Sequence, residues 1–158
     1  MVFDVINHLS ALIAVLGTAV VYGTDVFCAM VQRPALAHVD NSALLAVMGN
    51  IHRYGDRRMP VPGVLGMLAA AISAAFAAAS GCWTQAGAAG VAVGLLLVWL
   101  VLYLRVSQPI NHQLTAGVDH PESPTDARQL QRNWDKVITT RATLQGLALA
   151  ALCLALMI

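Results

Sequence analysis

Four long apolar stretches limit how this chain can fold more than any other feature. A helix needs about 20 consecutive, mostly apolar residues to cross the hydrocarbon core of a bilayer. Segments that meet this requirement lie at about residues 9–31, 60–83, 88–104 and 137–158. Within lipid an unpaired backbone N–H or C=O costs several kcal/mol, so each segment must close its hydrogen bonds internally as a helix. The sequence predicts an all-α fold, an integral membrane four-helix bundle with residues 1–158 as a single membrane domain.

The overall composition agrees with a chain that is solvated by lipid. Hydrophobic residues make up 58% of the sequence and charged residues 11%, against about 25% charged residues in an ordinary soluble domain. The net charge is +1, so no excess of positive charge points to nucleic acid as a partner. The lipid bilayer is the first expected partner.

The basic residues predict how the chain is oriented. All nine Lys and Arg residues lie in the loop between the first two spans, or in and beside the loop between the last two. They are Arg33, Arg53, Arg57, Arg58, Arg105, Arg128, Arg132, Lys136 and Arg141. The positive-inside rule places such loops in the cytoplasm. We therefore expect a multi-pass protein of the cell membrane, with loops one and three cytoplasmic and both termini outside.

The loops carry further structure. Residues 41–52 begin with a capping Asn-Ser pair and continue with an apolar stretch too short to span, which predicts a short extra helix that ends near Gly55. Pro109 is expected to end the third span, because proline interrupts the hydrogen bonding of a helix. Residues 120–124 are expected to be loop, and Thr125 is expected to cap a helix that leads into the fourth span.

Small residues indicate where helices approach each other closely. The second span is rich in alanine, and the third carries Gly87, Gly90 and Gly94, the last two at GxxxG spacing. Small side chains let two helix backbones pack by van der Waals contact. One interpretation is an interface between copies of the chain, which would make the protein a homo-oligomer. The other, which we favour, is packing within the bundle, because its four helices must pack against one another in any case.

Asp25 is the most informative single residue. It lies about two helical turns inside the cytoplasmic end of the first span, where an ionisable group costs roughly 2.5–3.5 kcal/mol. It should therefore face the bundle interior and have a partner. One hypothesis is a structural ion pair with Arg141, which lies one turn into the fourth span. The other is a catalytic role for Asp25, as a metal ligand or a proton acceptor.

Two further groups of polar residues lie at the cytoplasmic end. If the loop-one helix continues far enough, His52 and Asp56 share one face and could give two ligands to one metal ion. The alternative is a solvated basic loop that binds anionic headgroups. Asn111 and His112 follow the third span, where His112 could bind a metal or simply face water. Trp134 fits the aromatic belt at the membrane interface.

These residues together predict a polar pocket at the cytoplasmic end, roofed by the loop-one helix. The candidate residues for catalysis or for orienting a substrate are Asp25, Asn111 and Arg141. The candidate metal ligands are His52, Asp56, Asp25 and His112.

Several short segments at the ends of the spans carry a family resemblance. They are Arg33-Pro34-Ala35-Leu36, Arg58-Met59-Pro60, Gln108-Pro109-Ile110-Asn111, Asn133-Trp134 and Arg141-Ala142-Thr143-Leu144. On these segments the sequence resembles the anthrone-oxygenase-like family of small four-helix membrane proteins, over nearly the whole chain. Many relatives carry a histidine a few residues before the arginine that matches Arg141, and here Ile138 stands near that position. The resemblance implies an oxygenase or other oxidoreductase that acts on a lipophilic aromatic substrate, without an obvious organic cofactor.

Three functional hypotheses follow. The first is a membrane oxidoreductase with a cytoplasmic pocket for a lipophilic small molecule. The second is a non-enzymatic membrane subunit or scaffold whose basic loops dock a partner. The third is a haem- or metal-binding electron-transfer subunit, for which facing histidines on two spans would be expected, and the spans do not supply them. The cofactor is left open, with a metal ion as the candidate.

Overall fold

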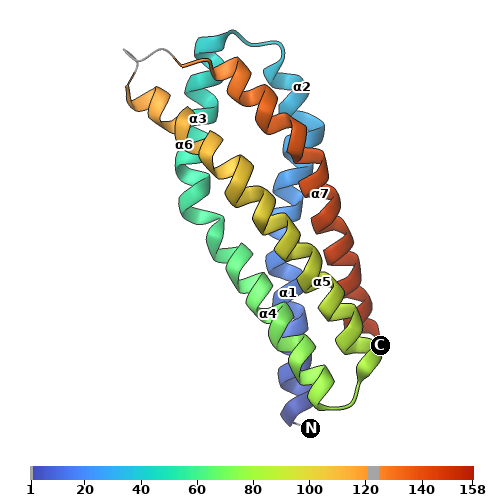
Figure 1. The fold of residues 1–158 in the computed structure, drawn as a ribbon. Helices are drawn as coiled ribbons and strands as arrows, with labels where there is room; N and C mark the ends of the chain where they lie inside the picture. The colour runs from blue at the N-terminus through green and yellow to red at the C-terminus, as the bar shows by residue number, and fades with distance from the viewer. Residues whose placement is uncertain (1, 121–124) are drawn as a thin grey trace.

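The computed structural model describes residues 2–120 and 125–158, which form an elongated bundle of helices (Figure 1). In chain order the elements are α1 (Val2–Phe27), a π-helical turn η1 (Cys28–Gln32), α2 (Arg33–Leu36), α3 (Asn41–Arg58), α4 (Pro60–Ala79), α5 (Trp83–Leu102), a second π-helical turn η2 (Tyr103–Ser107), α6 (Gln108–Asp119) and α7 (Ala127–Met157). The part of the chain that is described contains no strand. The predicted all-α fold is confirmed.

Four helical rods are long and apolar enough to cross a membrane, so the chain is an integral, multi-pass membrane protein. The rods are α1 with η1 and α2, α4 alone, α5 with η2 and α6, and α7. Both α1 and α5 pack against α4 and α7, which closes a four-helix bundle. The rod Trp83–Asp119 contains 37 residues, or about 55 Å of helix, against about 30 Å for the hydrocarbon core. This rod therefore extends well beyond the core of the bilayer.

The two ends of the bundle differ. Both termini and the turn between α4 and α5 lie at one end, which we call the terminal end, and α2, α3 and α6 lie at the other (Figure 1). The second end also carries the nine Lys and Arg residues, so we call it the basic end. There α3 packs against α6, and Arg53 of α3 forms an ion pair with Asp119 of α6. The predicted loop-one helix is thus present and lies over the basic end of the spans.

Helix α3 is longer than the sequence predicts. It starts after Asp40, whose carboxylate accepts a hydrogen bond from the backbone N–H of Ala43 at 2.8 Å. It does not end near Gly55, because the Gly55 carbonyl accepts from the N–H of Met59 at 2.8 Å and continues the helical pattern. Only Met59 separates α3 from α4. The continuation places His52 and Asp56 one turn apart on one face of α3.

The prediction that Pro109 ends the third span is wrong. Pro109 lies in the first turn of α6, which continues directly from η2. In η2 the N–H of Gln108 reaches the carbonyl of Tyr103, five residues back rather than four. The wider π turn makes room for the proline ring. It also accommodates the hydrogen bond that proline cannot donate, as local π adjustments do in other membrane helices. The rod therefore passes through Pro109 without a break.

The start of α7 also differs from expectation. Its cap is Asp126, whose carboxylate accepts from the N–H of Gln129 at 2.9 Å, and not Thr125. Asp126 is the better acceptor, because a carboxylate binds the exposed N–H groups of a first turn with charge assistance. Most of the loop predicted at 120–124 lies outside the described residues. In the same turn, Arg128 donates to the carbonyls of Leu36 and Val39 at 2.7 and 2.6 Å, which ties α7 to the chain that leads into α3.

Helices α1 and α4 approach each other closely at two glycines. A Cβ atom added at Gly17 would lie 2.7 Å from the carbonyl oxygen of Pro62 and 2.8 Å from the Cα of Gly66. By contrast, a Cβ at Gly87, Gly90 or Gly94 would meet nothing within 4 Å. Packing within the bundle is therefore the wrong explanation for these three, because they lie on the side of α5 that faces away from α4 and α7. The homo-oligomer interpretation stays a prediction.

Replacing Gly17 with Ala is expected to lower the free energy of unfolding by about 1–3 kcal/mol, because the added methyl group would press against backbone atoms that cannot rotate away. The measurement is an unfolding titration of the purified protein in detergent. Gly90→Ala is the matched control and should change the free energy by less than about 0.5 kcal/mol. Equal effects at the two positions would contradict the helix contact described here.

A buried polar cluster holds the terminal end together. Ser73 Oγ donates to Asn7 Oδ1 at 2.8 Å, and Asn7 Nδ2 donates to Gln85 Oε1 at 2.9 Å. Gln85 Nε2 in turn donates to the carbonyl of Ala155 at 2.9 Å. The four residues come from α4, α1, α5 and α7. This chain of hydrogen bonds therefore links all four spans inside an apolar bundle. Without these bonds the polar side chains would be buried without partners, which is costly in lipid.

Candidate functional site

A cavity of about 400 Å³ lies inside the basic end of the bundle. Residues from α1, α3, α4, α5, η2, α6 and α7 line it, and most of its wall is apolar. Its polar lining includes Asp25, His52, Asp56, Tyr103, Asn111 and Arg141. The predicted pocket at this end is thus present, with a helix of the first loop forming part of its wall.

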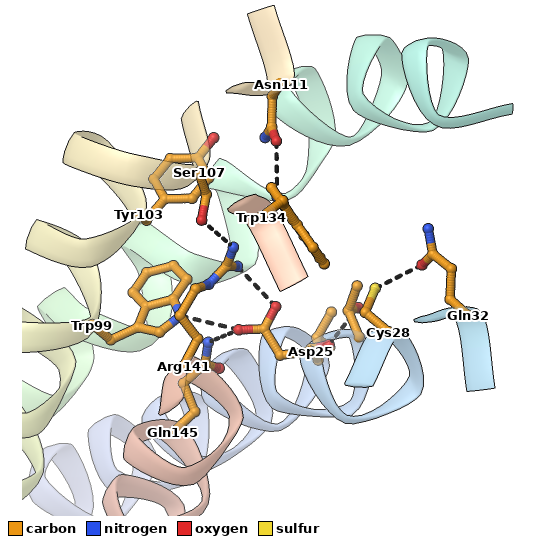
Figure 2. Close-up of polar contacts among 12 residues, drawn as sticks. Asp25, Cys28, Gln32, Trp99, Tyr103, Ser107, Asn111, Trp134, Arg141 and Gln145 are labelled. Carbon is orange, nitrogen blue, oxygen red and sulfur yellow. Dashed lines mark hydrogen bonds and ion pairs between the residues drawn. The ribbon is translucent and has the colours of Figure 1, made fainter. Parts of the chain in front are cut away.

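An ion pair forms one side of the cavity (Figure 2). Arg141 Nη2 donates to Asp25 Oδ1 at 2.8 Å, and Arg141 Nη1 donates to Ser107 Oγ at 2.8 Å. The two charged residues are 5% and 2% exposed. The pairing of Asp25 with Arg141 is therefore confirmed, and it removes the isolated charge that would otherwise make Asp25 so costly in the membrane.

The second oxygen of Asp25 is also occupied. Trp99 Nε1 donates to Asp25 Oδ2 at 3.1 Å, and Gln145 Nε2 donates to the same oxygen at 3.0 Å. Three donors from α5 and α7 thus surround one carboxylate from α1. Charge-assisted hydrogen bonds of this kind are shorter and stronger than neutral ones. The arrangement fixes Asp25 and leaves little of its coordination free for another ligand.

Three aromatic rings surround the guanidinium of Arg141. Its carbon Cζ lies 5.6 Å from the ring centre of Trp99, 5.5 Å from that of Tyr103 and 5.6 Å from that of Trp134. Trp99 and Tyr103 stack nearly parallel, with ring centres 5.8 Å apart and planes at 13°. Cation–π contacts gain strength when the cation is desolvated. Arg141 Nε is buried without a hydrogen-bond partner among the described residues, so one donor of the group is unused.

A second hydrogen-bond network centres on Asp56. Its Oδ1 accepts from the hydroxyl of Tyr103 at 2.9 Å and from Asn111 Nδ2 at 2.9 Å. Asn111 Oδ1 accepts from Trp134 Nε1 at 3.0 Å. Tyr103 and Trp134 also contact Arg141, so the two networks meet at the aromatic rings. Side chains from α3, η2, α6 and α7 therefore hold one another in place around the polar end of the cavity.

His52 lies in the same wall and is 6% exposed. Its ring centre is 5.7 Å from that of Trp134, and its Nε2 has no hydrogen-bond partner in the described part of the chain. Burial lowers the pKa of His52 to about 4, and the charge of Arg141 adds to this effect while that of Asp56 opposes it. The imidazole is therefore neutral at pH 7.

Acid is expected to destabilise the folded protein through His52. Unfolded, His52 takes up a proton near pH 6.5; folded, it does so only near pH 4. Between these values the unfolded state binds more protons, so the free energy of unfolding falls as the pH is lowered, by about 3 kcal/mol in total. His52→Gln removes this contribution. Unfolding titrations from pH 7 to 4 should show the wild type losing about this much relative to the variant, and parallel curves would contradict the burial of a neutral His52.

Both π turns lie next to the site. In η1 the N–H of Arg33 reaches the carbonyl of Cys28, and the turn starts three residues after Asp25. The other turn, η2, itself supplies Tyr103 and Ser107. A π turn changes the direction in which the following side chains point, and such turns are frequent at functional sites. Here η2 lies between Trp99 and Asn111, so it sets how these two side chains are rotated relative to each other.

The structure brings together most of the residues proposed from the sequence. The cavity wall includes Asp25, His52, Asp56, Asn111 and Arg141. His112, by contrast, is exposed on α6 and does not line the cavity. It points away because its neighbour Asn111 takes the inward position on the helix. Whether any of these residues acts in catalysis stays a prediction.

The metal site predicted from these side chains has no support in the geometry. Among the described residues, no group of three His, Cys, Asp or Glu side chains is placed to hold a metal ion. The physical reason is that both carboxylates are already engaged. Asp25 accepts from Arg141, Trp99 and Gln145, and Asp56 accepts from Tyr103 and Asn111. A metal ion would have to displace these donors.

Sequence reasoning missed several residues of the site. Trp99, Tyr103 and Ser107 recur every four positions along the third span, which is the spacing of one helix face and the only signal that could have identified them. Gln145 follows Arg141 by the same interval. Trp134 is 5% exposed and hydrogen-bonded inside the bundle, so its assignment to an interfacial aromatic belt is wrong.

No protein-family model, curated protein or solved structure was found to match this chain. The fold and the site themselves define the class of the protein, which is a multi-pass helical membrane protein with a mostly apolar internal cavity. The polar end of that cavity is formed by a buried ion pair, an aromatic cage and a neutral histidine.

Proposed function

We propose that this protein is a membrane oxidoreductase that binds a lipophilic aromatic substrate in the cavity and oxidises it with O₂. The observation that carries the proposal is His52, a neutral, buried imidazole in the cavity wall whose Nε2 has no hydrogen-bond partner among the described residues. A neutral imidazole can accept a proton from a bound substrate. The resemblance to the anthrone-oxygenase-like family supports the same class of chemistry. The basic end faces the cytoplasm in this proposal, as the positive-inside rule favours.

The cavity wall suits an aromatic substrate. Trp99, Tyr103 and Trp134 offer ring surfaces near the polar end, and aromatic rings pack favourably in offset or edge-to-face contacts. Arg141 lines the cavity beside these rings, and in this proposal its guanidinium is the group that faces a substrate carbonyl. A positive group near that oxygen stabilises negative charge as it develops, which is a main contribution to catalysis in a water-poor site. The ion pair with Asp25 keeps Arg141 in this position.

The reaction balances for an anthrone-type ketone. His52 Nε2 takes a proton from the acidic methylene carbon, and the resulting negative charge is shared with the carbonyl oxygen near Arg141. The carbanion transfers two electrons to O₂, a carbon–oxygen bond forms, and the proton held by His52 returns to give a hydroperoxide. Loss of water from the hydroperoxide leaves a second carbonyl. The methylene carbon thus loses two hydrogens and gains one oxygen atom, and the other oxygen atom leaves as water.

The test is conversion of an anthrone by purified protein in phosphatidylcholine vesicles. Oxygen uptake should match the substrate consumed, and with ¹⁸O₂ the quinone should carry one labelled oxygen atom. The exposed His112 provides a control, since His112→Gln should react like the wild type. Anthrone oxidises slowly in air, so a rate equal to that of protein-free vesicles, for anthrones and hydroquinones alike, would overturn the proposal.

A further inference from the structure

Part of the rim of the cavity is formed by helices that are long and apolar enough to span a membrane. The large hydrophobic residues that line the cavity and are largely exposed are Ile51 at 45%, on α3, and, on the membrane-spanning rods, Val64 at 54%, Leu68 at 56% and Leu104 at 47%. Val64 and Leu68 lie one turn apart on α4, and Leu104 lies in η2. All three belong to segments long and apolar enough to span a bilayer. Exposed apolar side chains at the rim, on membrane-spanning helices, indicate an opening toward lipid rather than toward water.

The opposite end of the cavity is polar, and its charge is unbalanced. The charged side chains that line the cavity are Asp25, Asp56 and Arg141, and His52 is neutral. Two carboxylates and one guanidinium give a local charge of −1. A head that is already anionic when it binds would be repelled, because charges interact strongly at short range inside a protein; the negative charge of the proposed reaction develops only together with the positive charge on His52. A neutral head with a carbonyl or hydroxyl meets no such repulsion.

We infer that the substrate is an uncharged amphiphile. Its aromatic head carries a carbonyl or hydroxyl and lies at the polar end, and a long apolar tail leaves the cavity between α4 and η2 and continues into the bilayer. Access is lateral, from the lipid. This inference rests on the proposed function for the chemistry of the head, and on the rim residues and the local charge for the tail and its exit.

The test compares ligands that share a head but differ in their tails. Wild-type protein in phosphatidylcholine vesicles is given a radiolabelled benzoquinone with a decyl tail, and its saturable binding is compared with that of the methyl-substituted head. The decyl compound should bind at least about tenfold more tightly, since its tail adds buried CH₂ groups in the cavity. A benzoate with the same decyl tail should bind at least about tenfold more weakly than the decyl quinone.

A bulky residue at the rim tests the exit. Leu68→Trp should weaken binding of the decyl quinone by about tenfold, because overfilling a packed site costs more than 1 kcal/mol. It should affect the methyl-substituted head much less. The matched control is Leu97→Trp on α5, since Leu97 is 49% exposed to lipid but does not line the cavity.

The outcomes separate this inference from the proposed function. Tail-dependent binding that Leu68→Trp weakens and Leu97→Trp leaves unchanged supports the inference, even if no oxidation is detected. Equal binding of the decyl and methyl compounds overturns it, even if anthrone is oxidised. Equal effects of the two tryptophan variants, or preferred binding of the benzoate, also overturn it.

Discussion

Replacing Arg141 with Gln is expected to lower the free energy of unfolding by about 3–5 kcal/mol, because it leaves Asp25 as a buried carboxylate without its counter-charge. Asp25 is 2% exposed, and its remaining partners Trp99 and Gln145 are neutral donors. Asp25→Asn should cost a similar amount, since it leaves the guanidinium unpaired among three rings. Unfolding titrations of the purified variants in detergent measure both effects.

The double variant separates the energy of the interaction between Asp25 and Arg141 from the effect of each substitution alone. Asp25→Asn combined with Arg141→Gln removes both charges, so it should cost clearly less than the sum of the two single changes. A non-additivity of several kcal/mol is the expected signature of a desolvated ion pair. Strict additivity, or single variants that each cost less than about 1 kcal/mol, would mean that water screens the pair and that the site is not closed as described.

Replacing His52 with Gln is expected to lower kcat for anthrone oxidation by about 10²–10⁴-fold, the usual contribution of a general base. Glutamine is close to histidine in size and can still form hydrogen bonds, so KM should change little. The measurement is steady-state oxygen uptake in vesicles at pH 7. His112→Gln serves as the control, because it removes an exposed histidine from the neighbouring α6.

Retention of the wild-type kcat by His52→Gln would show that another group accepts the proton. A folded state of normal stability must accompany the loss of activity for the interpretation to hold. At pH 7 the wild-type imidazole is already neutral, so the substitution is not expected to relieve or create a buried charge. Its effect on kcat is therefore separate from the acid destabilisation described above.

The sequence was a sound guide wherever one physical constraint dominates. The spans follow from the cost of unpaired backbone groups in lipid, and the described residues contain four helical rods long and apolar enough to be those spans. Asp25 could be assigned an inward position and an ionic partner because a charge at that depth has few alternatives. His52 and Asp56 could be placed on one helix face from their spacing alone, provided that the helix continued past Gly55.

The sequence was a poor guide wherever the answer depends on how helices are rotated against one another. Nothing in an apolar span distinguishes Trp99 as a donor to Asp25, or Tyr103 as a donor to Asp56, from aromatic residues that face lipid. The first contact depends on how α5 is rotated against α1, and the second on how η2 is rotated against α3. The prediction that Pro109 ends the third span was wrong for a related reason. It assumed an α-helix before the proline, and the chain forms a π turn there instead.

The π turn η2 also sets the rotational phase of the chain that follows it. A π turn holds one residue more than the α-helical turn it replaces, so if η2 became α-helical at unchanged length, α6 would rotate by about 100° against α5. Asn111 would turn away from Asp56, and other side chains of α6 would face the cavity. The apolar span and its place in the bilayer would be nearly unchanged. The extra residue in η2 therefore decides which face of α6 lines the cavity, while the length and hydropathy of the span stay the same.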